Sequence, residues 1–196
     1  MKAKYASLVL GAALLLAAAA PASAVVSETP PSLPWLKAGA VLTWKLDMGY
    51  DFGATVKALT PDLVFDYKMT NDSGTAGTVT IKEAALKDST VQHNYFMGGP
   101  LTLENETTVW VSKKVYKALK TAEPLVISPD AINETLKFVK TEKYAVTLDG
   151  KPAELDVLYG ETDKGHKFWI LDNPDNPIIC KMVISFTIEL KDIKSK

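Results

Sequence analysis

Hydrophobic and polar residues alternate along most of this chain, and the alternation predicts β-strands. Because successive side chains of a strand point to opposite faces, every second residue of a half-buried strand is apolar. One long run of such positions comprises Ala40, Leu42, Trp44, Leu46, Met48, Tyr50 and Phe52. Another comprises Ile178, Cys180, Met182, Ile184, Phe186, Ile188 and Leu190. Each run predicts one long strand with one buried face.

Shorter alternating runs lie between these two, and turn residues separate them. The short runs are residues 54–58, 63–69, 78–82, 107–111, 144–148, 153–159 and 168–171. Asp149-Gly150 and the Thr-Asp-Lys-Gly segment that ends at Gly165 have the composition of tight turns. The pattern of the last third of the chain, residues 143–192, therefore predicts a meander of antiparallel strands.

The middle of the chain follows a different pattern. Residues 83–89 have the composition of one or two helical turns. Residues 113–120 are predicted to form a short helix, with Ser112 as its N-cap. Residues 91–100 combine aromatic residues with glycines, which is typical of a loop. Further on, residues 129–139 fit either a helix or a strand.

These elements predict a mainly β fold with a minor α component. Two long one-sided strands near the ends, with hairpins between them, predict a curved antiparallel sheet that forms a barrel or half-barrel. Closure of this kind buries the apolar faces and removes exposed strand edges. One to three short helices are expected in the middle of the chain. A sandwich of two sheets is the alternative that the pattern leaves open.

The N-terminal residues have the pattern of an export signal. Lys2 and Lys4 precede an apolar stretch, and Ala22-Ser23-Ala24 matches a signal-peptide cleavage site. We expect cleavage after Ala24, a periplasmic or extracellular protein, and no transmembrane segment once the signal is removed. The expected division of the chain is a bacterial signal peptide at residues 1–24, a proline-rich leader at 25–38 and a single β-rich domain at 39–196.

The charged residues and the cysteine content narrow the classes of function. The formal net charge is −1, the cationic residues are all lysines, and no basic block occurs, so the chain is unsuited to nucleic acid. The absence of arginine disfavours a site that captures phosphate or carboxylate by bidentate hydrogen bonds. Cys180 is the single cysteine. An exported domain with one cysteine has no internal disulfide, so its stability depends on packing.

No group of residues matches a catalytic or metal-binding motif. Residues 172–176 carry side-chain oxygens that calcium prefers, but Asp, Asn and Pro also form tight turns. His93 and His166, with one cysteine, make no zinc motif. A hydrolase with its site around His93 or around the acidic pairs, Glu104 with Glu106 and Glu154 with Asp156, is a third hypothesis. It ranks third because no nucleophile motif accompanies these residues. We expect no cofactor and no metal.

Aromatic residues are frequent in the predicted strands and in the central loop, where they are candidates for the lining of an apolar cavity. The candidate ligand-binding residues are Trp44, Met48, Tyr50, Phe65, Tyr67, Tyr95, Phe96, Trp110 and Trp169. Our first hypothesis is a non-catalytic exported domain that binds an apolar small molecule, a lipid, a lipidated partner or another envelope protein under residues 91–108. The second is a structural or protein-interaction domain of the envelope without a cavity, since an ordinary aromatic core explains the same residues.

One segment of the last third joins a strand to a turn rich in Asn-Pro. It reads Phe-Trp-Ile-Leu-Asp-Asn-Pro-Asp-Asn-Pro-Ile from Phe168 to Ile178, and it follows Leu-Tyr-Gly-Glu at residues 158–161. This segment resembles part of exported bacterial envelope proteins of unknown function. The resemblance implies an envelope protein with a β-rich C-terminal half, and it implies no activity. The layout also looks like that of curved-sheet carriers of lipids or lipoproteins in the periplasm.

Overall fold

A computed structural model describes residues 32–196 of the chain, and this part is mostly β, with 52% of residues in strands and 8% in helices. The predicted signal peptide and residues 25–31 of the predicted leader lie outside the described residues. Eleven strands form one sheet in the order β5-β4-β3-β2-β1-β11-β10-β9-β8-β7-β6. The predicted mainly β fold is confirmed. Because one sheet holds all strands of the described part, the two-sheet sandwich is not formed there.

The N-terminal half of the sheet is a meander with one added edge strand. Its antiparallel strands are β1 (Val41–Leu46), β2 (Asp51–Ala58), β3 (Leu63–Met69) and β4 (Ala76–Ile81). The outermost strand, β5 (Gly99–Leu103), pairs with β4 in parallel. Residues 107–111, predicted as a strand, form only isolated bridges to other segments.

The prediction of one long strand over residues 40–52 was wrong, because the chain turns back between β1 and β2. Gly49 has a φ of +87°, and Leu46 N–H donates to the Tyr50 carbonyl across the turn. Trp44 lies opposite Phe52 in the hairpin. The two residues are an even number of positions apart, so the alternation of apolar residues continues through the turn as if the strand were unbroken.

The C-terminal half of the sheet is a second meander. Its strands are β6 (Leu125–Ile127), β7 (Glu134–Leu148), β8 (Lys151–Thr162), β9 (Lys167–Leu171), β10 (Ile179–Val183) and β11 (Thr187–Lys194). The single long strand predicted over residues 178–190 is again a hairpin, and Met182 lies opposite Ile188. The stretch that fitted a helix or a strand becomes strand from Glu134 onward.

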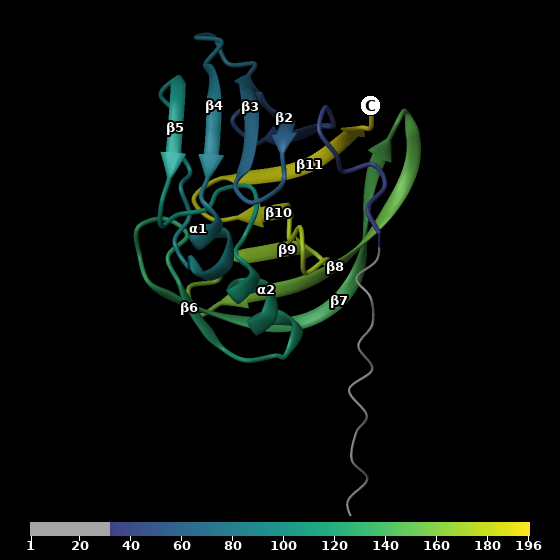
Figure 1. The fold of residues 1–196 in the computed structure, drawn as a ribbon. Helices are drawn as coiled ribbons and strands as arrows, with labels where there is room; N and C mark the ends of the chain where they lie inside the picture. The colour runs from purple at the N-terminus through teal and green to yellow at the C-terminus, as the bar shows by residue number, and fades with distance from the viewer. Residues whose placement is uncertain (1–31) are drawn as a thin grey trace, which may run out of the picture.

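The sheet curves until β7 meets β11. Thr147 pairs with Asp192 and Leu148 with Ile193, in parallel, so the pairings from β7 through β8, β9 and β10 to β11 form a closed circuit. Figure 1 shows β2–β5 running across the direction of β8–β11. This crossing encloses the core, whose largest fully buried side chains are Trp44, Trp110, Phe52, Phe65 and Phe168.

Two short helices interrupt the strands where the sequence predicted helical turns, α1 (Glu83–Asp88) and α2 (Lys113–Lys120). The predicted N-cap of α2 is confirmed, because Ser112 Oγ accepts a hydrogen bond of 3.2 Å from Val115 N–H. The two helices contact each other beside β6 (Figure 1). Within residues 32–196, no helix combines the length and apolar character needed to cross a membrane.

Candidate functional site

A groove of about 920 Å³ lies beside α1, and we call it the Trp110 groove. Four segments build it: the turn after β2, the helix α1, the segment in front of α2 and the turn after β9. Its lining residues are Leu59, Thr60, Pro61, Leu63, Glu83, Leu86, Lys87, Trp110, Val111, Lys113, Asp175, Asn176 and Pro177. Its volume lies within the range of roughly 300–1,000 Å³ that is typical of small-molecule pockets.

The Trp110 groove has an apolar floor and a charged rim. Leu63, Trp110 and Val111 are buried, and Trp110 is only 1% exposed. Trp110 Nε1 is buried and has no hydrogen-bond partner within the described residues. A buried donor without an acceptor costs roughly 1–3 kcal/mol, so this N–H lowers the stability of the folded protein. The rim carries two acids and two lysines, Glu83, Lys87, Lys113 and Asp175, whose charges balance.

Hydrogen bonds to two aspartates hold the walls of the groove in place. Asp62 accepts from Lys82 Nζ at 2.7 Å and from Glu83 N–H at 2.9 Å, so it joins the β2–β3 turn to the start of α1. The hydrogen bond from Lys82 lowers the pKa of Asp62. Asp172 accepts from Tyr116 Oη and Lys120 Nζ, each at 2.8 Å, and so joins α2 to the turn after β9.

The Asp-Asn-rich turn considered for calcium is thus occupied by protein donors. Besides the bonds to Asp172, Asn173 Oδ1 accepts from the N–H groups of Asp175 and Asn176, at 3.1 and 2.9 Å. These are the bonds of a tight turn. Within the described residues, no group of three or more His, Cys, Asp or Glu side chains is placed to hold a metal ion.

A second concavity, the methionine pocket, has a volume of about 40 Å³ and lies under residues 94–96 of the central loop. It is lined by Leu46, Met48, Tyr50, Phe52, Met69, Asn94, Phe96, Thr108, Val109, Ile179, Met182, Phe186 and Ile188. Hydrogen bonds fix the loop above it: His93 N–H donates to the Thr107 carbonyl at 2.7 Å, and Gly98 N–H donates to Tyr67 Oη at 3.0 Å.

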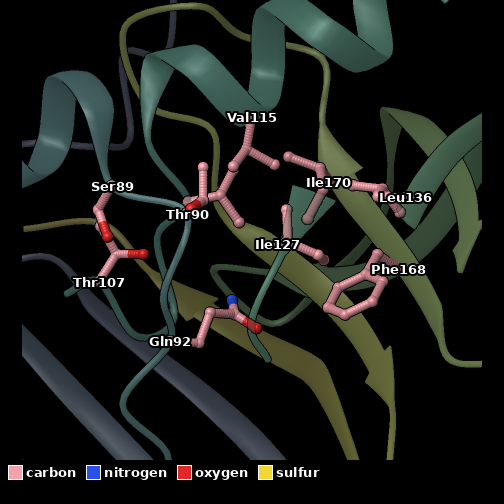
Figure 2. Close-up of a pocket in the computed structure, with 10 residues that line it drawn as sticks. Ser89, Thr90, Gln92, Thr107, Val115, Ile127, Leu136, Phe168 and Ile170 are labelled. Carbon is pink, nitrogen blue, oxygen red and sulfur yellow. The ribbon is translucent and has the colours of Figure 1, made fainter. Parts of the chain in front are cut away.

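A third concavity, of about 10 Å³, lies on the other side of the same loop. Figure 2 shows Ser89 and Thr107 at one end and the apolar side chains of Ile127, Leu136 and Phe168 at the other. Gln92 borders it with a buried Oε1 that has no partner in the described structure. A space of this size holds about one water molecule, so it is too small for a ligand.

Each histidine is paired with a glutamate. His93 Nδ1 lies 2.9 Å from Glu106 Oε2, and His166 Nδ1 lies 2.9 Å from Glu134 Oε2. In many nucleophilic sites a carboxylate orients a histidine. The other ring nitrogen of that histidine then needs a hydroxyl or thiol beside it, from which it takes the proton. Within residues 32–196, no serine, threonine or cysteine side chain is hydrogen-bonded to either ring. Cys180 is free and fully buried, and burial raises the pKa of its thiol.

The nine candidate ligand-binding residues are dispersed by the fold. Trp110 lines the groove, and Met48, Tyr50 and Phe96 line the methionine pocket. The structure buries Trp44, Phe65 and Tyr67 in the core and leaves Tyr95 exposed. Trp169 is elsewhere, stacked on Tyr159. Their role in binding stays a prediction.

Sequence reasoning missed most of the groove. Its floor includes Leu59 and Leu63 at the β2–β3 turn, Leu86 in α1 and Pro177 after β9, which lie in three different segments and share no motif. The only signal that pointed toward them was the irregular pattern of residues 83–120, which contributes Glu83, Leu86, Lys87, Trp110, Val111 and Lys113 to the lining. In comparisons with known proteins, no protein-family model, no curated protein and no solved structure matches this chain.

Proposed function

We propose that this protein is an exported, non-catalytic binding protein that holds an uncharged apolar ligand in the Trp110 groove. The observation that carries the proposal is the combination of a volume of about 920 Å³ with an apolar floor. Burial of apolar ligand surface against such a floor supplies roughly 25 cal/mol per Å² of binding free energy. Export is the part of the proposal that rests on the N-terminal residues, whose pattern is that of a cleaved signal peptide.

The chemistry of the groove specifies the ligand further. Because the two acids and two lysines of the rim balance, the groove favours no net charge on its ligand. A neutral apolar molecule, such as an uncharged lipid, combines these properties.

The alternative of a protein-interaction domain has less support. β5 and β6 are the two outermost strands of the sheet, and an unpaired edge can accept a strand from another chain. However, β6 has only three residues, and β5 has only five and contains Pro100, which has no N–H to donate to a further strand. Short strands and edge prolines are typical of edges that resist pairing.

Two uncharged fluorescent probes test the proposal on the purified protein. Prodan carries a ketone acceptor, whereas N-phenylnaphthylamine has no carbonyl. We expect both probes to bind with a blue-shifted emission. The variant Leu86→Trp fills the groove and is expected to weaken both by about tenfold or more, which corresponds to about 1.4 kcal/mol. Val126→Trp adds the same ring at a position 53% exposed and outside the groove, and is the matched control.

Circular dichroism and thermal unfolding of each variant establish that it is folded. The proposal is overturned if neither probe binds, or if Leu86→Trp and Val126→Trp have equal effects.

A further inference from the structure

Three methionines from distant parts of the chain border one small volume. Met48 lies in the turn between β1 and β2, Met69 ends β3, and Met182 lies in β10. All three line the methionine pocket of about 40 Å³. The described residues contain a single further methionine, Met97, which is 92% exposed and does not line the pocket.

The other residues of the pocket are aromatic, aliphatic or uncharged. Tyr50, Phe52, Phe96 and Phe186 supply aromatic rings, and the centres of the Phe52 and Phe96 rings lie 4.9 Å apart. No Asp, Glu, His, Lys or Cys is in the lining. The pocket therefore offers thioether sulfurs and the negative faces of aromatic rings. Its polar side chains are those of Tyr50, Asn94 and Thr108, and it lacks the carboxylate, imidazole and thiolate groups that dominate calcium, magnesium and zinc sites.

Such a set of groups matches one class of ligand. Soft thioether sulfur selects soft monovalent ions such as Cu(I), and aromatic faces attract a cation within about 6 Å. We infer that the methionine pocket binds Cu(I), with the sulfur atoms of Met48, Met69 and Met182 as its ligands. The ion keeps its oxidation state, and no bond of the protein forms or breaks apart from coordination.

The exposed side chain of Met48 gives the ion an entry point to the pocket. Met69 and Met182 are buried, whereas Met48 is 55% exposed. Methionine is a common filler of irregular gaps in a core, and this role accounts for the two buried residues. It does not account for Met48, which is largely in water and still borders the pocket. Tyr50 Oη lies 3.8 Å from Met48 Sδ, so this sulfur lies beside one of the aromatic residues of the pocket.

Anaerobic titration of the purified protein with Cu(I) tests the inference. Bicinchoninate, a coloured Cu(I) chelator, serves as the competitor. We expect the protein to withdraw one equivalent of Cu(I) from the chelator, and X-ray absorption of the loaded protein to show sulfur neighbours. Each of Met48→Leu, Met69→Leu and Met182→Leu should lower the affinity by about tenfold or more, because leucine keeps the volume and removes the ligand. Met97→Leu is the matched control.

Repeating the titration with Ag(I), which has the same preference for sulfur, separates binding from redox chemistry. Thermal unfolding of each variant separates loss of a ligand from loss of fold. Three results would overturn the inference: no withdrawal of Cu(I), equal loss in Met97→Leu, or absorption spectra with nitrogen and oxygen neighbours alone, which would place the ion at a histidine. None of these results bears on the Trp110 groove, which shares no lining residue with the pocket.

Discussion

Tyr159 and Trp169 lie directly opposite each other on β8 and β9, and their rings stack with centroids 4.5 Å apart and 25° between the ring planes. A lysine flanks each ring: Lys140 Nζ lies 5.8 Å from the centre of Tyr159, and Lys181 Nζ lies 5.2 Å from the centre of Trp169. Lys181 continues the row to Glu189 on β11, with an ion-pair distance of 2.6 Å. One row of side chains thus connects β7 to β11, the strands of the closed circuit.

The stacked pair should be energetically coupled. In a double-mutant cycle of Tyr159→Ala and Trp169→Ala, we expect an interaction free energy of about 0.5–1.5 kcal/mol, as for other aromatic pairs. Urea unfolding of the four proteins measures it. The control cycle combines Trp169→Ala with Tyr95→Ala, whose ring is exposed, and should be additive. A coupling of zero in the first cycle would contradict a role of the stack in stability.

Tyr159 should also make stability depend on alkaline pH. Burial and the hydrogen bond from its hydroxyl to Glu161 raise the pKa of Tyr159 to about 12. An unfolded tyrosine ionises near pH 10, so a rising pH stabilises the unfolded state before it stabilises the folded state. The contribution of Tyr159 is therefore complete below about pH 10 and is lost toward pH 12.

The variant Tyr159→Phe isolates this effect. We expect its urea midpoint to fall less than that of the parent between about pH 9 and pH 11. A slope remains in the variant, because burial also raises the pKa values of Tyr116 and Tyr144. Tyr95→Phe serves as the exposed control. If Tyr159→Phe and Tyr95→Phe have the same slope as the parent, the hydroxyl of Tyr159 is not protected from ionisation.

Gly77 is expected to be essential for the pairing of β5. It lies opposite Gly99 in the parallel ladder, and a Cβ at Gly77 would lie 1.8 Å from the Gly99 carbonyl oxygen. Backbone has to move to relieve such a clash, so Gly77→Ala should lower the free energy of unfolding by about 1–3 kcal/mol. Hydrogen exchange of the β5 amides should be faster in this variant than in the parent.

Gly53→Ala is the matched control for that change. Gly53 also lies in a strand, but the nearest atom to its added Cβ would be the Lys68 carbonyl oxygen at 3.6 Å, an ordinary contact. Because alanine restricts the unfolded chain, this variant should be neutral or up to about 1 kcal/mol more stable. Equal stability of Gly77→Ala and Gly53→Ala would show that β5 tolerates displacement.

Ser112 should stabilise α2 through its cap. The side chain is fully buried and accepts from Val115 N–H, so Ser112→Ala leaves a buried donor without a partner. We expect a loss of about 1 kcal/mol in urea unfolding, within the range of measured cap replacements. Ser73→Ala, in the turn between β3 and β4, is the comparison and should change stability by less than about 0.5 kcal/mol. A Ser112→Ala protein as stable as the parent would refute the cap.

The local pattern of the sequence determined most of the strands, which of their residues face the core, and the positions of α1 and α2. Trp44, Phe52, Met182 and Ile188 were all assigned to apolar faces by alternation alone, and all four are buried. The hairpin turns within the two long runs could not be seen, since opposite residues of a hairpin keep the same alternation when an even number of positions separates them. Periodicity reports which face a side chain takes, and it does not report where the strand reverses.

Pairing between distant segments was decided by the tertiary structure alone. The pairings of β4 with β5 and of β7 with β11 are parallel, so no hairpin turn makes them. They depend on how the whole sheet curves. The same curvature brings Leu63, Trp110 and Pro177 to one groove, and it brings Met48, Met69 and Met182 to one pocket. The alternation of each segment is compatible with many registers and curvatures, and only the packing of all strands around one core selects among them.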